Sequence, residues 1–339
     1  MREDLKFVYV LTSKETDTYL EQAYVSMYSL KQQMPEAFIS LVTDDITSDT
    51  FVGTRKEELK FVDELVSVKL DAKYNAKQRS RLLKTSLRNM INGDYLFLDT
   101  DTIICQPLYD VLNYEADIAI CYEFHCEDFQ NGSAFNYVSK KFIDLQWDIK
   151  QVNHYYNSGV MFVRDNEVTR NFYKLWYRNL LYSFTKGQFV DQPALIKTDL
   201  QLGNIIKPLD GHWNSQIMQG LQYFGGAYVI HYFIESIKKP GDPILFILQD
   251  LNLLACIKKD AVIPDIIKET VKDPYKGLNC KIKTLFGTDL EFSYTNVYGT
   301  FRRRYGKPSF NVINTLLIKY SNLKKLLLHK LLTSVKGGG

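Results

Sequence analysis

Two carboxylates close an apolar segment that reads Tyr95-Leu-Phe-Leu-Asp99-Thr100-Asp101. Where the backbone is extended, residues two apart point to the same side with Cα atoms about 7 Å apart, so these side chains can converge. Converging carboxylates repel each other unless a cation lies between them, and such hard oxygen ligands suit Mn²⁺ or Mg²⁺. The ion would bind a diphosphate and act as a Lewis acid on a departing phosphate. A turn-forming Asp pair is the simpler interpretation, but the apolar run before it favours a metal site.

Four cations precede this segment at intervals of four, three and four residues: Lys77, Arg81, Lys84 and Arg88. That spacing places them on one face of a helix. A solvated surface is the ordinary explanation of such a face. The predicted helix leads directly into the two carboxylates, however, so we expect one or two of the four cations to bind a diphosphate.

A regular alternation of strand and helix patterns would position these groups. The predicted strands are 7–11, 38–42, 61–68, 94–98, 116–122 and 158–163, and the predicted helices are 17–33, 48–60, 76–91 and 167–182. This alternation predicts an α/β domain with a mostly parallel, Rossmann-like sheet, helices on both faces, and ligands beyond the carboxyl ends of the strands. Gly-x-Gly-x-x-Gly and Gly-x₄-Gly-Lys-[Ser/Thr] do not occur in the sequence, which excludes a dinucleotide fingerprint and a P-loop.

The composition is that of a globular protein. The chain has 339 residues and is 45% hydrophobic, enough for one large domain or a domain with an appendage. Its five cysteines include no Cys-x-x-Cys pair, which favours free thiols in a reducing compartment. The N-terminus lacks the apolar region of a secretory signal, and no apolar run approaches the roughly 18 residues of a membrane span. We therefore expect a cytoplasmic protein.

The charge is unevenly distributed, although the net charge is only +3. No Asp or Glu follows Glu291, whereas nine Lys and Arg residues do. The first 291 residues therefore have a net charge of −6. This distribution predicts an anionic partner for the tail alone, and no nucleic acid. Residues 311–336 form a predicted helix whose apolar face carries Val312, Ile313, Leu316, Leu317, Tyr320, Leu323, Leu327, Leu328, Leu331 and Val335. Lysines beside such a face can reach lipid phosphates, so we expect peripheral contact with the inner face of an anionic membrane. A helix packed on the domain, or a dimer seam, is the alternative.

Four short motifs occur in the order found in one enzyme family. They are Leu96-Phe-Leu-Asp-Thr-Asp101, Asn157-Ser158-Gly-Val-Met-Phe-Val163, Asp191-Gln192 at the start of a helix, and Val229-Ile-His231. In this order they resemble glycosyltransferase family 8, which includes bacterial lipopolysaccharide galactosyl- and glucosyltransferases and the glycogenins. The resemblance covers about residues 6–240 and implies a GT-A fold. It also implies transfer of a hexose, glucose or galactose, from a UDP-sugar to a hydroxyl of a glycan or lipid-linked glycan, with retention of configuration.

The same resemblance assigns roles to individual residues. Asp99, Asp101 and His231 would hold Mn²⁺ or Mg²⁺. Asp191 and Gln192 would flank the reacting sugar as the catalytic pair. Tyr19 would stack on a uracil, and Asn157 would contact the sugar hydroxyls. With the basic helix included, the residues expected to bind the nucleotide-sugar are Leu11, Thr12, Ser13, Tyr19, Lys77, Arg81, Lys84, Asp99, Thr100, Asp101, Asn157, Ser158, Lys238 and Lys239.

The chain departs from the family pattern at two places. Pro193 follows the catalytic pair, where many members carry a second acidic residue. The Lys-Pro beyond His231 comes two residues late, which leaves the lysine for the β-phosphate open between Lys238 and Lys239.

Two other functions fit part of the pattern. Asp99 and Asp101 nearly match the haloacid-dehalogenase phosphatase motif, in which the first Asp is a nucleophile. About 90 residues of α/β pattern precede them here, however, and Ile103 stands where Thr or Val is expected. A sugar-nucleotide-binding protein without activity is the second alternative. The predicted layout is a GT-A domain over 1–255, an extension over 256–310 and a basic amphipathic helix over 311–336.

Overall fold

The computed structural model describes residues 5–131, 135–233, 244–278 and 288–336. The chain divides into two compact units, Met1–Ile282 and Lys283–Gly339. The boundary expected at residue 255 therefore falls inside the first unit, which also includes much of the expected extension.

The first unit is built on a seven-stranded sheet with the order β3-β2-β1-β4-β7-β6-β8. The strands are β1 (Lys6–Leu11), β2 (Phe38–Asp44), β3 (Glu64–Val68), β4 (Tyr95–Leu98), β6 (Ile118–Tyr122), β7 (Tyr156–Val163) and β8 (Ile206–Pro208). Only β7 runs against its neighbours, β4 and β6, while the other pairs of adjacent strands are parallel. The mostly parallel sheet predicted from the sequence is thus confirmed.

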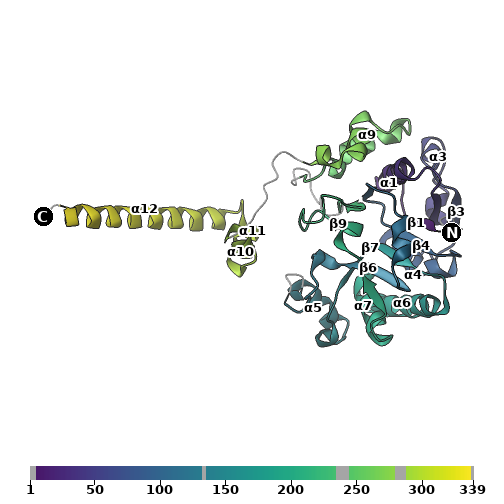
Figure 1. Cartoon of the computed structure of the whole chain (residues 1–339), viewed down its shortest axis with the longest axis horizontal. Coiled ribbons are helices and arrows are strands. Elements are labelled where there is room, and N and C mark those ends of the chain that lie inside the picture. The colour runs from purple at the N-terminus through teal and green to yellow at the C-terminus, as the bar shows by residue number, and fades with distance from the viewer. Residues whose placement is uncertain (1–4, 132–134, 234–243, 279–287, 337–339) are drawn as a thin grey trace. The chain divides into compact units, whose positions relative to one another are not determined.

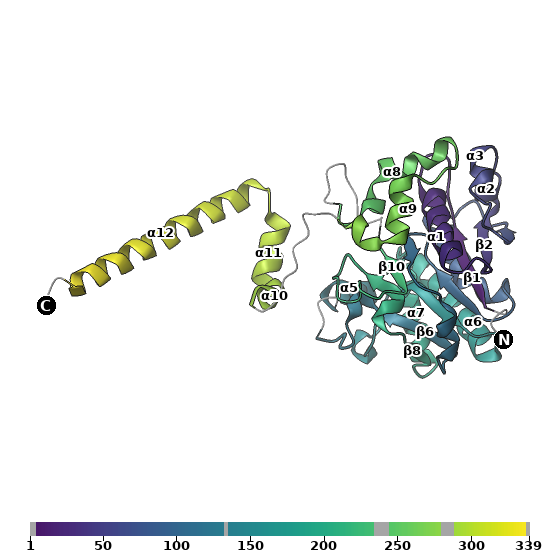
Figure 2. The ribbon, with the colours of Figure 1, turned by 45° about the horizontal axis from the view of Figure 1, so that its top comes forward.

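Helices cover both faces of this sheet, as predicted (Figure 1, Figure 2). Alternate side chains of β1 separate the two layers: Val8 and Val10 pack with α4 (Ala76–Thr85), α6 (Glu167–Thr185) and α7 (Gln192–Gln201), whereas Tyr9 and Leu11 pack with α1 (Tyr19–Gln33). Strands buried on both faces are mostly apolar, and all eight residues of β7 are buried, the polar Asn157 and Ser158 near its start included. The sheet edge at which β1, β4 and β6 end is therefore fixed from both sides.

A second, three-stranded sheet lies beside the first. Its strands are β5 (Thr102–Ile104), β10 (Val229–His231) and β9 (Ser215–Gln216), in the order β5-β10-β9. β5 and β10 are antiparallel and pair Thr102 with His231. This register places the histidine next to the loop that joins β4 to β5.

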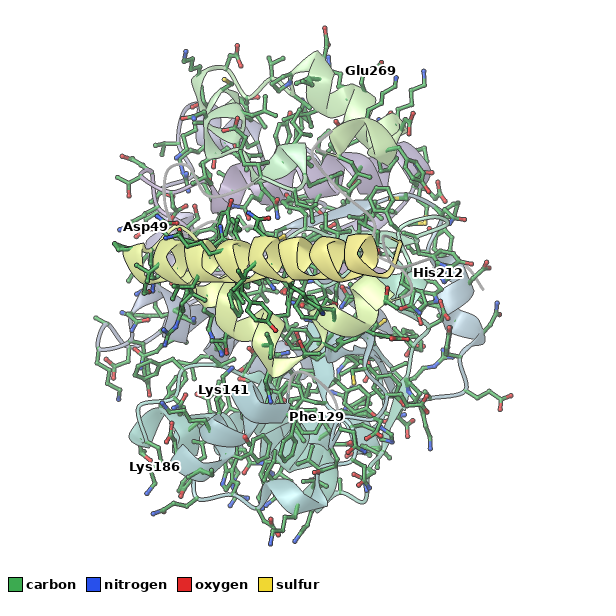
Figure 3. All side chains as sticks on the ribbon, turned by 90° about the vertical axis from the view of Figure 1, so that its left-hand side faces the viewer. Asp49, Phe129, Lys141, Lys186, His212 and Glu269 are labelled. Carbon is green, nitrogen blue, oxygen red and sulfur yellow. The ribbon has the colours of Figure 1, made fainter. Side chains whose placement is uncertain are left out.

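The end of the first unit packs on α1. α8 (Leu251–Ala255) and α9 (Asp265–Lys272) contribute Leu254, Ile267 and Val271 to a cluster that includes Val25 of α1. The outer face of α9 is exposed and carries Glu269 (Figure 3). These contacts explain why the unit extends past the expected boundary.

Two predicted helices are shorter than expected. The helix predicted over 48–60 is wrong: α2 (Asp45–Ser48) and α3 (Thr54–Glu57) are separate, because Gly53 has a φ of 55°, in the left-handed region. The helix predicted over 76–91 begins with a capping box at Asn75 but ends at Thr85, followed by a short 3₁₀ turn. α5 (Phe135–Asp144) was not predicted.

The described part of the second unit contains α10 (Thr288–Ser293), α11 (Asn296–Arg304) and α12 (Pro308–Lys336). Rings of Phe301 and Phe310, 6.0 Å apart, join the last two helices. The helical tail is thus present, starting slightly before the predicted residue 311. In the described parts of the chain, none of the helices has the length and apolar character needed to traverse a bilayer.

Two buried acids, Glu21 on α1 and Glu58 after α3, lie near each other. Neither carboxylate oxygen of Glu58 has a hydrogen-bond partner among the described residues. Burial raises the pKa of Glu58 to about 8, and the nearby Glu21 adds to this, while Arg55 and Lys258 oppose it. Glu58 therefore carries a proton in the folded chain at neutral pH.

We expect Glu58→Gln to stabilise the protein at alkaline pH. The pKa of Glu58 is higher in the folded chain than in the unfolded chain. The Glu58 carboxyl therefore makes its full contribution to the stability of the folded chain below about pH 4.5, and this contribution is lost as pH rises through about 8. The variant has no proton to lose, so its free energy of unfolding should exceed that of the parent by about 1 kcal/mol at pH 9, after allowance for screening by water. Urea unfolding at pH 6 and pH 9 measures this. An equal fall in stability for both proteins between the two pH values would contradict the assignment.

Candidate active site

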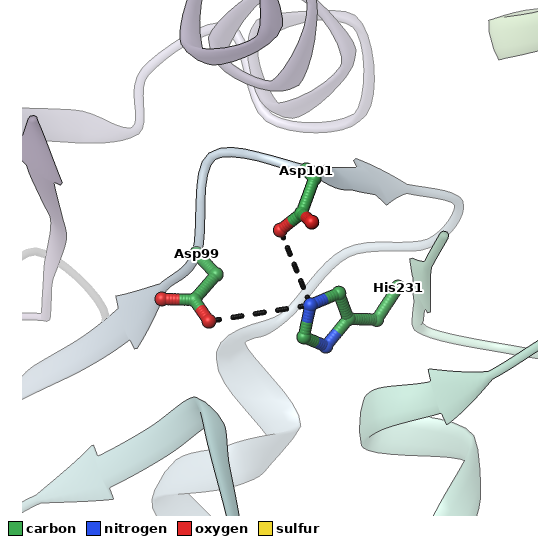
Figure 4. A group of neighbouring side chains, drawn as sticks. All are labelled: Asp99, Asp101 and His231. Carbon is green, nitrogen blue, oxygen red and sulfur yellow. Dashed lines mark ion pairs between the residues drawn. The ribbon is translucent and has the colours of Figure 1, made fainter. Parts of the chain in front are cut away.

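Three potential metal ligands meet where the two sheets adjoin. Asp99 follows β4, Asp101 immediately precedes β5, and His231 ends β10. Nε2 of His231 lies 3.2 Å from Oδ1 of Asp101 and 4.0 Å from Oδ2 of Asp99 (Figure 4). One ligand atom from each of the three residues lies within 4.8 Å of the others. The β5–β10 pairing thus adds an imidazole to the carboxylates that the sequence places two residues apart.

The charges of this cluster call for a cation. Burial raises the pKa of Asp99, against the attraction of Lys84 and His231. Burial would favour a neutral His231 ring, but Asp101 and Asp99 raise the pKa of His231 above its ordinary value. Two carboxylates and one imidazole form a donor set that suits Mn²⁺ or Mg²⁺, and all three residues line a pocket from which a diphosphate could supply further oxygens. The residues therefore fit the metal that the sequence analysis expected.

A glycine allows the histidine its position. A Cβ atom on Gly159 of β7 would lie 2.4 Å from Cε1 and 2.6 Å from Nδ1 of His231. These distances are far below any normal carbon contact, so only glycine fits beside the ring. The backbone carbonyl of Gly159 also accepts a hydrogen bond from the N–H of Asp99 at 2.8 Å. One residue of β7 therefore positions two of the three potential ligands.

Gly159→Ala should displace the His231 ring and weaken Mn²⁺ binding by about tenfold or more. Titration calorimetry with Mn²⁺ measures the affinity. Gly220→Ala is the matched control, because a Cβ on Gly220 meets no atom within 4 Å. Unchanged Mn²⁺ affinity in the Gly159 variant would show that the histidine is not a ligand.

A buried lysine joins the metal cluster to the candidate catalytic pair. Nζ of Lys84 lies 3.3 Å from Oδ1 of Asp99 and 3.6 Å from Oδ2 of Asp191, and it donates to Oγ of Ser158 at 3.1 Å. Lys84 is 2% exposed. Since α4 ends at Thr85, this lysine sits in the last turn of the helix and reaches across the carboxyl end of β4.

Asp191 is held as a carboxylate. Nε of Arg81 lies 3.1 Å from its Oδ1, and the hydroxyl of Ser158 donates to its Oδ2 at 2.8 Å. Burial alone would raise the pKa of Asp191, but Lys84, Arg81 and Ser158 lower it to about 2. The group is therefore suited to hold cations in place, and not to take up a proton near neutral pH.

These groups line a pocket of about 750 Å³. Most of the expected site residues lie along its wall: Leu11, Thr12, Tyr19, Lys77, Arg81, Lys84, Asp99, Thr100, Asp101, Asn157, Ser158, Asp191, Gln192 and His231. Residues that are far apart in the sequence are thus brought together at one sheet edge.

Among the described residues, one expected residue, Ser13, is not among those lining the pocket. Ser13 is buried, and its hydroxyl donates to Asp17 and accepts from Arg55. Lys238 and Lys239 lie outside the described residues. Arg88, the fourth cation of the basic face, is buried on the 3₁₀ turn after α4, where it pairs with Asp165. The helix ends before Arg88, so the prediction of four cations on one helix is wrong for Arg88, and α4 carries only Lys77, Arg81 and Lys84 of the four.

A further basic residue, Lys141 of α5, and a further acidic residue, Glu123, line the pocket. Glu123 accepts hydrogen bonds from Nδ2 of Asn157 at 3.0 Å and from Nε2 of Gln192. Burial raises the pKa of Glu123, and the two amides oppose this. Glu123 follows β6 as Asp99 follows β4, so the rule that ligands gather beyond strand ends could have identified it.

Comparison with known proteins supports a nucleotide-sugar transferase. Residues 71–205, less than half of the chain, match the nucleotide-diphospho-sugar transferase family. This stretch contains the basic helix, both carboxylates of the metal cluster and the Asp191–Gln192 pair. The comparison with curated proteins found no match.

Solved structures similar to the chain include three transferases. Mouse xyloside xylosyltransferase 1 is 14% identical, with a TM-score of 0.45, and the match covers 67% of this chain and 97% of that protein. The glycosyltransferase GlyE of Streptococcus pneumoniae TIGR4 is 15% identical, with a TM-score of 0.48, and the match covers 83% of this chain and 66% of that protein. The galactosyltransferase LgtC, solved with donor and acceptor sugar analogues, is 13% identical, with a TM-score of 0.45. That match covers 67% of this chain and 87% of LgtC.

Proposed function

We propose that this chain is a metal-dependent GT-A glycosyltransferase. It transfers a hexose, glucose or galactose, from a UDP-sugar to a hydroxyl of a cell-surface glycan or lipid-linked glycan such as lipopolysaccharide. The observation that carries this proposal is the arrangement of Asp99, Asp101 and His231 on the wall of a large pocket, with Lys84 bridging them to Asp191. The family match over residues 71–205 includes most of these groups.

The proposed roles follow the positions of the residues in the pocket. Asp99, Asp101 and His231 hold the Mn²⁺ or Mg²⁺ ion, which supplies Lewis-acid stabilisation to the departing diphosphate when bound. Lys84 and Arg81 add fixed positive charge on the same side, where negative charge develops in the transition state. Tyr19 of α1 offers an aromatic face for the uracil, next to Leu11 and Thr12 at the end of β1.

The sugar lies against the pair that opens α7. Asp191 keeps Lys84 and Arg81 in place, and Gln192 presents its side chain to the anomeric carbon. The bond between this carbon and the β-phosphate oxygen breaks as the acceptor oxygen bonds from the same face, and the acceptor proton passes to the departing phosphate. This course retains the configuration of the sugar without a covalent intermediate on the protein.

Metal-dependent turnover of UDP-sugars tests the proposal. The full chain, incubated with UDP-glucose or UDP-galactose and Mn²⁺, should release UDP, and EDTA should stop the reaction. Release of inorganic phosphate from phosphomonoesters without UDP-sugar turnover would instead identify a phosphatase using Asp99. Thermal stabilisation by UDP and Mn²⁺ with no turnover of any UDP-hexose, with glycan acceptors present, would identify a binding protein without activity.

We also propose that α12 contacts an anionic membrane. Val312, Leu316, Tyr320 and Leu323 follow one another along this helix, and each is more than half exposed. Lys319 and Lys324 are exposed on the same helix. No acidic residue follows Glu291, so the charge of this segment is complementary to anionic lipid headgroups.

Leu316→Glu combined with Leu323→Glu should abolish sedimentation of the full chain with phosphatidylglycerol vesicles. The two charges would be placed among lipid tails, while the helix and the first unit stay unchanged. UDP-sugar hydrolysis, measured in parallel, should be unaffected. Deletion of 309–339 should have the same result. If the deletion unfolds the protein, or if the parent ignores such vesicles at low salt, α12 is a packing or dimerisation element.

A further inference from the structure

A line of hydrogen bonds leads from Glu123 to the metal cluster. Oε2 of Glu123 accepts from Nδ2 of Asn157 at 3.0 Å, and Oδ1 of Asn157 accepts from Nδ2 of Asn214 at 2.9 Å. Oδ1 of Asn214 in turn lies 3.1 Å from Nδ1 of His231. Both asparagines and the histidine are buried. We refer to these four residues as the amide relay.

The chemistry of its members gives the amide relay one direction. A carboxylate can only accept, so Asn157 must turn its NH₂ group to Glu123. The N–H of Gly159, which can only donate, bonds Oδ1 of Asn157 at 3.0 Å and fixes the same orientation independently. The carbonyl oxygen of Asn157 then requires the NH₂ group of Asn214, and this leaves the oxygen of Asn214 for His231.

The direction of the relay determines what His231 offers to a metal. Nδ1 faces an oxygen and must carry a proton, so Nε2 is the nitrogen that can bind a cation. On the other side of the ring, Asp99 and Asp101 by themselves would favour a proton on Nε2. A metal ion at Nε2 satisfies both sides, because it replaces that proton while Nδ1 continues to donate to Asn214.

A second branch of hydrogen bonds leads from Glu123 to the candidate catalytic pair. Nε2 of Gln192 donates to Glu123 and also to the carbonyl oxygen of Tyr156 at 3.1 Å. Both hydrogens of this amide are therefore used within the protein. Among the described residues Oε1 of Gln192 makes no hydrogen bond, and it is the atom available to a sugar in the pocket.

We propose that Glu123 is a positioning residue that sets the direction of both branches. Through Asn157 and Asn214 it turns Nε2 of His231 toward Asp99 and Asp101, and directly it turns Oε1 of Gln192 toward the donor sugar. Glu123 thus couples the metal cluster to the reaction centre without touching the metal. The inference rests on the proposed metal-dependent function.

Mn²⁺ affinity and the Nδ1 proton of His231 test this proposal together. Glu123→Met removes the acceptor at similar volume, and Asn214→Leu interrupts the relay at a residue that does not line the pocket. Each should weaken Mn²⁺ binding in calorimetry about tenfold, the low end for residues that orient a ligand. The double variant should lose little more than either single one, because both break the same relay. Glu123→Gln keeps an acceptor oxygen and should bind Mn²⁺ within about twofold of the parent.

The second readout needs no metal. In protein labelled with ¹⁵N-histidine, the Nδ1–H of His231 should be protected from solvent exchange in the parent and in Glu123→Gln, and unprotected in Asn214→Leu and Glu123→Met. Additive losses of Mn²⁺ affinity, or a His231 Nδ1–H that is unprotected in the parent, would overturn the relay. If the parent does not bind Mn²⁺ at all but shows the protected proton, the relay stands and the proposed metal-dependent function fails.

Discussion

Asp101→Asn should lower UDP-sugar turnover about 10³-fold, equivalent to about 4 kcal/mol of transition-state stabilisation. The substitution replaces a charged oxygen ligand by a neutral amide of the same size, so the metal cluster loses one negative charge. Nε2 of His231 lies 3.2 Å from this carboxylate and would face a neutral amide instead of a charged group. The measurement is the initial rate of UDP release at saturating Mn²⁺.

The fold should survive this change, because Asp101 lies on a loop and the backbone hydrogen bond from Tyr232 to its carbonyl oxygen remains. Circular dichroism and thermal unfolding check this. Asp49→Asn is a suitable control, since Asp49 is exposed (Figure 3) and does not line the pocket. Turnover at the parent rate in the Asp101 variant, or in the parent with EDTA, would refute a metal-dependent reaction.

Lys84→Met should reduce UDP affinity by about 2–3 kcal/mol and leave uridine affinity nearly unchanged. Lys84 is the most buried cation of the pocket, and a hydrogen-bonded charge in such a place contributes far more than an exposed one. Its partners, Asp99 and Asp191, would lose their shared cation, so we also expect lower thermal stability. Calorimetry with UDP and with uridine separates an effect on the diphosphate from a general disturbance.

Lys77→Met is the informative comparison for this variant. Lys77 lies on the same helix and lines the same pocket, but it is exposed, so its removal should cost UDP binding no more than about 1 kcal/mol. Equal losses for UDP and uridine in Lys84→Met would contradict a contact between the lysine and the diphosphate. If that variant does not fold, Arg81→Met should show the same preference for UDP at smaller magnitude.

The strand-end carboxylates and the basic helix could be predicted from local sequence. Asp99 and Asp101 are two residues apart in a segment whose apolar pattern is unambiguous, and Lys84 lies on the helix just before it. Local spacing alone predicts that the lysine lies near the carboxylates, because a helix and the strand that follows it pack side by side in an α/β domain. Six of the seven strands of the sheet follow from the same alternation, whereas β8 was not predicted.

Other parts of the site depend on pairings that no local pattern reveals. His231 could be named only through the resemblance, because nothing near it in the sequence predicts its pairing opposite Thr102. Asn214 was not considered, since a buried amide has no signature in a sequence. Asn157 and Gly159 belong to β7, the one strand of the seven-stranded sheet that runs against its neighbours. They therefore reach the site from the start of a strand, whereas the sequence reasoning considered only strand ends.

Helix lengths were the other source of error. A single helix was predicted over 48–60, yet Gly53 interrupts it with a left-handed backbone. The basic face was extended to Arg88 because the four cations recur at helical intervals, although the helix ends three residues earlier. Periodicity describes which residues could share a face, and backbone breaks decide which of them do.

The pairing of β5 with β10 has a consequence for how the protein is synthesised. It joins residues about 130 positions apart, so a growing chain exposes Asp99 and Asp101 long before His231 leaves the ribosome. Contacts of such long range form slowly, because a large loop must close before any stabilisation is gained. We expect the nascent chain to remain unable to capture metal and nucleotide-sugar tightly until β10 has emerged and paired. Binding competence would then appear late and in one step.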